Sequence, residues 1–248
     1  MTLKRVMDSD TPNPCIGHQP KPHRRGRRKW FGIGSTCFLI ALVAFSWPRS
    51  ADLRQFDPYT AAQIEGKLWR SYYQKDRLGL LGGLYRFGRD VYGFSPSSAA
   101  GMAWHAARAA TGFQSSKNRS EARRALPNLI HYFNELQRGS PARFNASAVA
   151  EIELEWWQQR REGKHWREYA PLVAEVTARV YGVANEKVLP FASVRCEMMA
   201  RRDAGKLRGL TQSDWSEIEA GLVNAWCALH ESVNRGVRLE PLSTVTKP

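Results

Sequence analysis

The 248-residue sequence has little cysteine, four residues in all, at positions 15, 37, 196 and 227. No two of them form a Cys-x-x-Cys pair, so the spacing typical of zinc sites and thioredoxin-type redox sites is missing. Cys196 and Cys227 could join as a disulfide in an oxidising compartment. In a helical hairpin turning at residues 204–211 they would lie about 12 Å out of register along the helix axes, which argues against that bond.

Motifs that carry chemistry are also missing. The serines show no Gly-x-Ser-x-Gly elbow. The glycines at 79, 82 and 83 interrupt a helical pattern and lack the strand–loop–helix setting of a phosphate-binding loop. His105 and His131 have no paired acid in sight, which is typical of packed or surface histidines. We therefore expect no cofactor, and the sequence identifies no catalytic residue, specific partner or oligomeric state.

Alternating polar and apolar residues, the pattern of a half-buried strand, are scarce beyond residue 48. Apolar residues recur there every three or four positions instead, as on the buried face of a helix. The predicted fold is all-α: one N-terminal transmembrane helix, then an exported bundle of six to seven helices with antiparallel neighbours. The helices are expected at 57–85 or beyond, 95–113, 120–136 with a bend at Pro127, 145–163, 166–181, 185–205 and 211–233.

One uncharged run stands out, the 18 residues from Trp30 to Trp47. A helix of that length reaches roughly 27 Å, close to the thickness of a bilayer's hydrocarbon core. The run shows no polar stripe, which disfavours a buried helix of a soluble domain. Residues 30–47 are therefore predicted to be a retained membrane anchor, its contacts with lipid made by Trp30, Phe31, Phe38, Leu39, Ile40, Leu42, Val43, Phe45 and Trp47.

The orientation of this anchor follows from the basic residues that precede it. Residues 1–29 hold eight cations and two carboxylates, a net charge of +6. Short basic flanks stay in the cytoplasm, so the N-terminus is expected inside and residues 48–234 outside as the helical domain. Residues 1–29 should be a disordered leader and 235–248 a loose tail. The topology-setting residues next to the membrane are Arg24, Arg25, Arg27, Arg28 and Lys29.

Two alternatives for the anchor stay open. A cleaved signal peptide also has a basic, then apolar, then small-residue order, and residues 44–46 loosely match a cleavage site. The leader is long for such a signal, and Trp47 is a poor first mature residue. Residues 27–31 also match a twin-arginine export signal, although an ordinary basic flank is the simpler interpretation. Either route exports the same domain.

The net positive charge of the exported part indicates which partners it would attract. Of the total charge of +14, the leader takes +6, which leaves +8 beyond the uncharged run. Such a surface favours the lipid bilayer, an acidic component of the cell envelope or a membrane-protein partner. Nucleic acid is disfavoured because the basic residues are spread and no recognition motif is present.

Carboxylates at helical spacing raise one further hypothesis. Glu65, Glu153 or Glu155, and Glu197 could turn into the bundle, as the glutamates of ferritin-like metal proteins do. That fold also needs two Glu-x-x-His motifs, and the one match, at residues 162–165, straddles a glycine. Pairing of these glutamates with the neighbouring arginines is the simpler interpretation. The sequence thus favours a non-enzymatic, membrane-anchored interaction or scaffold module, with an envelope enzyme or carboxylate–metal protein as the alternative.

Overall fold

The computed structural model describes residues 50–205 and 208–235, and this part of the chain is helical without a strand, which confirms the predicted all-α class. Eight of its helices have ten residues or more. They are α2 (Pro58–Tyr73), α3 (Arg77–Arg86), α4 (Pro96–Ser115), α6 (Leu126–Arg138), α7 (Ala146–Arg161), α8 (Trp166–Tyr181), α9 (Asn185–Ala204) and α10 (Gln212–Asn234). Three short segments join them: a π-helix, η1 (Phe87–Val91), one turn of helix, α5 (Arg119–Ala122), and a 3-10 turn, η2 (Arg123–Ala125).

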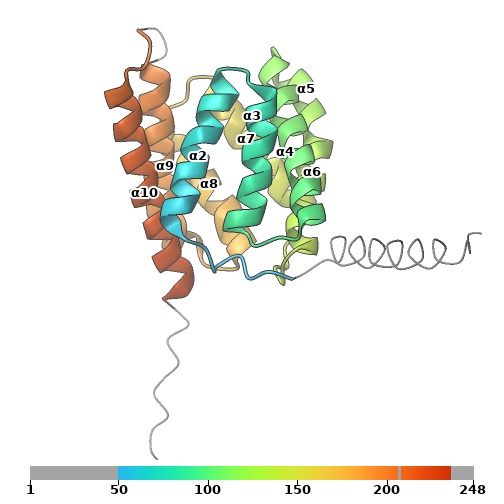
Figure 1. Cartoon of the computed structure of the whole chain (residues 1–248). Helices are drawn as coiled ribbons and strands as arrows, with labels where there is room; N and C mark the ends of the chain where they lie inside the picture. The colour runs from blue at the N-terminus through green and yellow to red at the C-terminus, as the bar shows by residue number, and fades with distance from the viewer. Residues whose placement is uncertain (1–49, 206–207, 236–248) are drawn as a thin grey trace, which may run out of the picture. The chain divides into compact units, whose positions relative to one another are not determined.

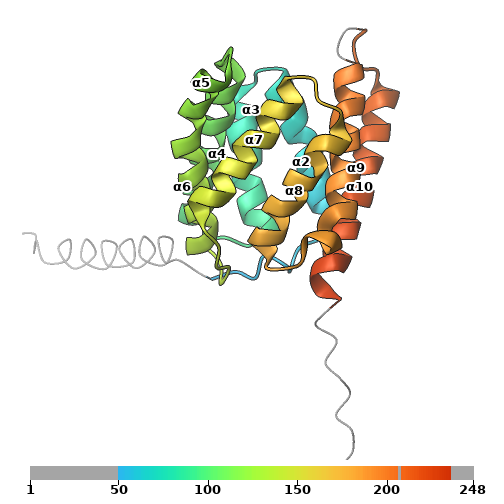
Figure 2. The same cartoon turned by 180° about the vertical axis from the view of Figure 1, so that it is seen from behind.

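The eight helices form a closed ring. Each packs against the next along the chain, and α10 returns to pack against α2. Successive helices run antiparallel to one another along the ring axis (Figures 1 and 2). Helices α2 and α3 lie on one side of the ring, and α7 and α8 lie on the opposite side. Because an even number of antiparallel helices closes the ring, α10 and α2 also meet antiparallel.

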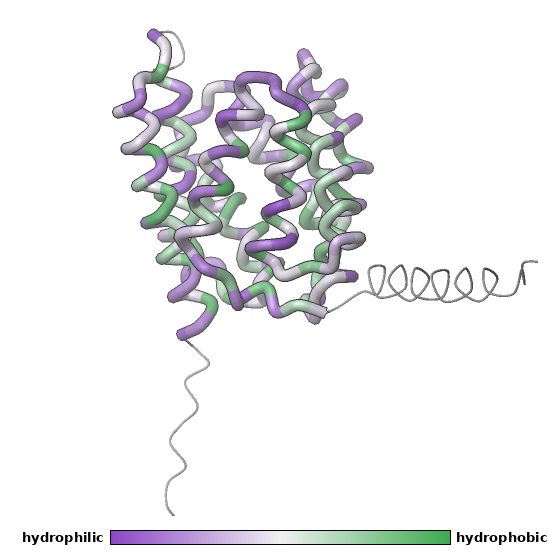
Figure 3. The backbone as a smooth tube through the Cα atoms, in the orientation of Figure 1, coloured by the Kyte–Doolittle hydropathy of each residue, from purple (hydrophilic) through white to green (hydrophobic). Residues whose placement is uncertain are grey.

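Local signals in the sequence begin these helices as predicted. The side chains of Asp57, Ser95 and Asn145 accept hydrogen bonds from the first turns of α2, α4 and α7. Thr211 forms a reciprocal capping box with Asp214 at the start of α10. Short hydrophobic and hydrophilic stretches alternate along the helices (Figure 3), as expected for helices with one buried side.

The predicted number of helices, six to seven, was too low for one reason. The sequence predicted one helix from residue 57 to residue 85 or beyond, but the chain turns at Gln74–Asp76 with Lys75 at a φ of 58°. Asp76 then caps α3 through the backbone N–H of Gly79, at 2.9 Å. At the predicted bend the 3-10 turn η2 directly precedes α6, and Pro127 lies in the first turn of that helix.

Within residues 50–205 and 208–235, no helix has the length and apolar character that crossing a bilayer requires. The predicted anchor, 30–47, and the leader, 1–29, lie outside the described residues, as do residues 236–248 of the predicted tail. The anchor and its orientation therefore stay predictions.

Residues 50–57, here called the strap, cross one end of the ring before α2 begins (Figure 1). The Ala51 N–H donates to the Gly139 carbonyl at the end of α6, at 2.8 Å. The Arg54 guanidinium donates to the Tyr181 carbonyl at the end of α8, also at 2.8 Å. Leu53 and Phe56 of the strap are buried. The strap thus covers the end of the ring at which α6, α8 and α10 finish.

Candidate functional site

The interior of the ring holds two adjoining cavities, of about 210 and 220 Å³. The first is lined from α2, α3, η1, α6, α7, α8, α9 and α10, so it lies at the centre of the ring. The second is lined from α2, α3, α4, α7 and α9. The two cavities share Glu65, Leu68, Leu84, Glu153 and Arg195, so these residues stand where the cavities meet.

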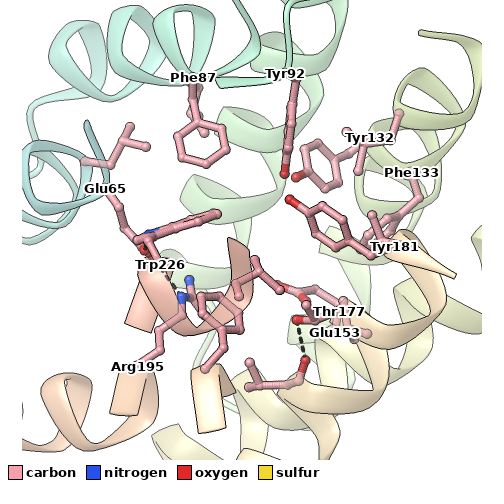
Figure 4. A pocket seen from close by; sticks show the side chains of 18 residues that line it. Glu65, Phe87, Tyr92, Tyr132, Phe133, Glu153, Thr177, Tyr181, Arg195 and Trp226 are labelled. Carbon is pink, nitrogen blue, oxygen red and sulfur yellow. Dashed lines mark hydrogen bonds and ion pairs between the residues drawn. The ribbon is translucent and has the colours of Figure 1, made fainter. Parts of the chain in front are cut away.

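Glu65 has a hydrogen-bond partner on each of its carboxylate oxygens. Its side chain is 7% exposed, and Oε1 accepts a hydrogen bond from Arg195 Nε at 2.7 Å. Its second oxygen, Oε2, accepts one from the indole of Trp226, also at 2.7 Å. Glu65, Arg195 and Trp226 belong to α2, α9 and α10, so this cluster joins the last two helices of the ring to the first (Figure 4). Both oxygens of this buried carboxylate therefore have a hydrogen-bond donor.

Glu153 on α7 has a different environment. Its two oxygens accept hydrogen bonds from the indoles of Trp156, at 2.9 Å, and Trp157, at 2.8 Å. No Lys, Arg or His nitrogen of the described residues forms an ion pair with it, and Arg195, which acts on it from a distance, is paired with Glu65. Burial raises the pKa of Glu153, and the two indole hydrogen bonds oppose that rise. The first cavity therefore contains one carboxylate whose charge no ion pair neutralises.

Three tyrosines from distant parts of the chain turn their hydroxyl groups toward one another in the first cavity (Figure 4). Tyr92 follows η1, Tyr132 lies on α6 and Tyr181 ends α8. Burial raises the pKa of Tyr92 to about 12 and those of Tyr132 and Tyr181 well above the usual value. The negative charge of Glu153 contributes to the rise at Tyr92 and Tyr132, so the phenols and this carboxylate share one electrostatic environment.

The hydroxyl of Tyr181 is the polar group in this cavity that the protein leaves unsatisfied. Tyr181 is 6% exposed. Its hydroxyl faces that of Tyr92 but makes no hydrogen bond of normal geometry with a protein atom. A buried hydroxyl without a partner costs about 1–3 kcal/mol, so a water molecule or a ligand that forms a hydrogen bond with it would stabilise the folded protein.

The π-helix η1 places two aromatic residues, Phe87 and Tyr92, in the wall of the first cavity. Phe87 opens η1, and the backbone N–H of Tyr92 closes its last turn by donating to the Phe87 carbonyl at 3.2 Å. The two rings pack edge to face, 5.1 Å apart, and Phe87 also contacts Trp226. A π-helical turn adds a residue to the helical repeat and reorients the residues after it, and such turns often occur at functional sites.

The basic side chains that line the second cavity, Arg160 and Arg195, are paired, and so is the neighbouring Arg202. Arg160 donates to Asp203 at 2.8 Å and also to the hydroxyl of Tyr73. Arg202 stacks on the face of the Tyr73 ring, 3.1 Å from its centroid, and donates to Asp203 at 3.0 Å. Aromatic residues on α2, α4 and α7, among them Trp69 and Phe113, complete the wall. This end of the interior is therefore held by neutralised charges and apolar surface.

The ring does not bring together the four glutamates of the carboxylate–metal hypothesis. Glu65 and Glu153 both line the cavities. Glu155 instead forms an ion pair with Arg119 at 2.9 Å, and Glu197 is exposed on α9. Among the described residues, no three His, Cys, Asp or Glu side chains are grouped so that they could hold a metal ion. Two of the four predicted positions thus belong to the interior.

The other candidate side chains lie away from the cavities. The imidazoles of His105 and His131 stack on each other, 4.8 Å apart, between α4 and α6. Cys196 and Cys227 are both free thiols. Burial raises the pKa of Cys196 to about 12, which keeps this thiol protonated and unreactive at neutral pH.

The interior residues that sequence reasoning missed are Arg195, Trp226 and the three tyrosines. Arg195 stands beside Glu197 in a carboxylate-plus-arginine pattern in which Glu197 itself is exposed. The tyrosines come from three separate segments, so no local spacing relates them. A helical-wheel comparison of α9 would have shown Arg195 on the same face as Met199 and Phe191, and that was the available signal.

The fold and the site define a closed antiparallel ring of α-helices with an aromatic, partly polar interior. No protein-family model, curated protein or solved structure matches the chain. Function is therefore argued from the site itself.

Proposed function

We propose that the chain is a single-pass, membrane-anchored binding module of the cell envelope, non-enzymatic, whose helical ring holds a small molecule in its interior. The observation that carries the proposal is the pair of adjoining cavities at the centre of the ring. Ligand pockets of proteins are mostly apolar and contain a few placed polar groups. The interior has this composition, with aromatic walls around Glu153 and the hydroxyl of Tyr181.

A structural role alone accounts poorly for this interior. Helices with larger apolar side chains at these positions would fill the space, since cavities reduce stability by about 24 cal/mol per Å³ in a measured series of core variants. The Tyr181 hydroxyl and the charge of Glu153 each add a further cost. A bound molecule that fills the space and contacts both groups would offset these costs, because binding to the folded state alone stabilises it.

The test is to identify what the intact protein carries. We expect native mass spectrometry of the full chain, purified in a mild non-ionic detergent, to show a small molecule retained at one per chain. Val173→Phe, which adds a ring at the wall of the first cavity, should release that molecule. Val223→Phe is the matched control, since Val223 is a partly buried α10 residue that lines neither cavity. Retention in the Val173→Phe protein would contradict an interior site.

The membrane anchor rests on residues 30–47, with the N-terminus in the cytoplasm and the ring outside. Trp47 is three residues from Ser50, so the chain can separate them by at most about 11 Å. An anchor of this kind would confine the domain to a thin layer beside the membrane. A C-terminal reporter that works only outside the cytoplasm should be active; replacement of the five basic residues at 24, 25 and 27–29 by glutamine should reduce that activity.

Docking of an acidic envelope component or protein is a second candidate, favoured by the +8 charge beyond the anchor. Such docking would weaken steeply as salt is raised, whereas a molecule held inside the ring would be retained. A pull-down from solubilised envelopes at low and high salt separates the two candidates.

A further inference from the structure

We propose that the interior site takes a small organic cation of the alkylammonium type, held with its positive charge near Glu153 and its polar end at Tyr181. This inference rests on the proposed function, because it specifies which class of molecule occupies the ring. It is carried by three features of the first cavity: an unneutralised carboxylate, aromatic walls and an unpartnered hydroxyl.

The charge distribution of the interior favours a cation. Arg195 and Glu65 are directly paired, at 2.7 Å, so neither is available to a ligand without breaking their ion pair. Glu153 has only neutral donors, the two indoles, on its oxygens. With Glu65 and Arg195 cancelling, the ionised groups that line the first cavity, Glu65, Glu153 and Arg195, sum to one negative charge. A monocation would neutralise it, whereas an anion would face Glu153 with no unpaired positive partner.

The aromatic walls of the first cavity also favour a cation. Phe87, Tyr92, Tyr132, Phe191 and Trp226 all line the first cavity. The faces of aromatic rings attract cations, and this attraction is strongest where the site is desolvated, as in the aromatic cages that bind quaternary ammonium groups. An alkylammonium group also buries methyl or methylene groups against these rings. The apolar walls thus suit the same ligand as the carboxylate.

The Tyr181 hydroxyl provides a polar anchor at the strap end of the cavity. It is buried and turned into the cavity, where it faces the Tyr92 hydroxyl but makes no hydrogen bond of normal geometry with a protein atom. The carbonyl of the same residue is held by Arg54 of the strap, which fixes the end of α8 from which the phenol projects. A ligand with a hydroxyl or carbonyl group as well as an ammonium centre would have a polar partner in Tyr181 and an anionic partner in Glu153. The size of the cavity agrees, since about 150 Å³ is enough to hold benzene and this one has about 210 Å³.

The probe for the test is choline, compared with its neutral isostere 3,3-dimethylbutan-1-ol and with the related anion 3,3-dimethylbutanoate, whose charge stands where choline has its hydroxyl group. The full chain would be titrated in a maltoside detergent, which has no ammonium head group, by calorimetry and by tryptophan emission. We expect choline to bind at least about tenfold more tightly than its neutral analogue, from the cation–π and charge terms together. The anion should bind more weakly still.

Two variants assign the contacts. Glu153→Gln should abolish the preference for choline over its neutral analogue, whereas Glu197→Gln, at an exposed glutamate of α9, should leave it unchanged. Tyr181→Phe should remove the advantage of choline over tetramethylammonium, which lacks the hydroxyl group, and should leave the binding of tetramethylammonium itself unaltered. Circular dichroism of each variant establishes that the ring is folded.

The outcomes separate this inference from the function on which it rests. Tighter binding of the neutral or anionic probe, or a choline preference that survives Glu153→Gln, overturns the cation while leaving an interior site. If no ammonium from tetramethyl- to benzyltrimethylammonium binds, the cation is likewise excluded. If the purified chain also carries no small molecule, the cavities hold water alone and the proposed function fails with it.

Discussion

Glu153 and Glu155 are two residues apart on one helix, and their side chains point in opposite directions. Both belong to α7, but Glu153 lines the interior with its oxygens on two indoles, whereas Glu155 reaches outward to Arg119. Two helical residues apart means about 200° around the axis, so the two side chains must leave on opposite sides. The sequence alone leaves open which of the two turns inward, because the apolar residues around them, Ile152, Leu154 and Trp156, do not form one narrow stripe.

The raised pKa of Glu153 predicts a pH-dependent component of stability. Burial places its folded-state pKa above the usual value of 4.5, so the folded protein binds this proton more tightly than the unfolded chain does. Stability from this group is then greatest below 4.5 and falls as pH rises through the folded-state pKa. Urea unfolding over that range should show a smaller loss in Glu153→Gln than in the parent protein.

The exposed Glu197 provides the control for that series, since Glu197→Gln removes the same charge from the surface of α9. Its profile should follow that of the parent. Carboxylates whose pKa values are lowered by hydrogen bonds, such as Asp57 and Glu162, add stability that is lost as pH falls. Their contribution is common to all three proteins and cancels in the comparison. Parallel profiles for Glu153→Gln and the parent would contradict a desolvated, cavity-facing carboxyl.

Two ion pairs of α2, Glu65–Arg195 and Arg70–Glu219, have the same length and differ in burial, so they test how burial changes the contribution of an ion pair to stability. Glu65→Ala leaves Arg195 without its partner in the interior, and we expect a loss of about 3–5 kcal/mol in the free energy of unfolding. Glu219→Ala breaks the Arg70–Glu219 pair between α2 and α10, also at 2.7 Å but half-exposed. This loss should be below about 1 kcal/mol.

Denaturant titration of both variants decides the comparison. Adding Arg195→Met to Glu65→Ala should recover much of the loss, because it removes the uncompensated charge rather than restoring a contact. Equal losses for Glu65→Ala and Glu219→Ala would show that the interior pair is as well solvated as the surface pair.

At the scale of the element, helix starts were more predictable than helix faces. Asp57, Ser95, Asn145 and Thr211 were each expected to begin a helix, and each accepts a hydrogen bond from its first turn. Capping is a short-range interaction between a side chain and the backbone three residues further along the chain, so it can be predicted from the local sequence. The turn before α3 was missed because no glycine or proline marks Gln74–Asp76, so Asp76 was not recognised as the residue that caps a new helix.

The tight contact between η1 and α4 gives a prediction at the scale of the element, for a substitution at Gly88 of η1. A methyl group at Gly88 would lie 3.1 Å from the Cα atom of Ala99 and 3.0 Å from its Cβ atom, so the backbones would have to separate. We expect Gly88→Ala to reduce the free energy of unfolding by about 1–3 kcal/mol. It should also weaken ligand retention, because η1 carries Phe87 and leads to Tyr92.

Gly82 is the matched position on α3. A methyl group there would meet nothing within 4 Å, and the residue is not buried inside its helix. Gly82→Ala should therefore raise stability by about 0.5–1 kcal/mol, since alanine has the better helix propensity. Thermal unfolding followed by circular dichroism measures both variants. A stabilising Gly88→Ala would mean that η1 and α4 are not in tight contact.

For the whole molecule, the sequence predicted the class of fold but not its closure. Helical periods and short connections identify antiparallel neighbours along the chain, and that part of the topology follows from local information. The packing of α10 on α2 joins segments that are 149 residues apart at the Arg70–Glu219 pair. Closure creates the interior, so the site that depends on Glu65, Trp226 and Tyr181 could not be read from any one stretch of sequence.

Closure of the ring makes α10 indispensable to the rest of the fold. Its Trp226 donates to Glu65 on α2, at 2.7 Å, and packs against Phe56 of the strap, Phe87 of η1 and Phe191 of α9. A chain ending at Ala204 would expose these three rings and leave one oxygen of Glu65 without its donor. Since burial of apolar area is the main force holding the helices together, we expect the truncated protein to lose its cooperative thermal transition and to expose apolar surface.

A second truncation, ending at Arg235, keeps α10 whole and removes only residues of the predicted loose tail. We expect it to unfold cooperatively at the midpoint of the full chain, followed by circular dichroism and by tryptophan emission together. Coincident transitions in that protein and their loss in the shorter one would tie stability to the contact between α10 and α2. An unchanged transition in the chain ending at Ala204 would mean that seven helices are self-sufficient and that the interior is an open groove. The Glu65–Arg195 pair would then face solvent, and the large effect expected for Glu65→Ala would shrink to that of a surface pair.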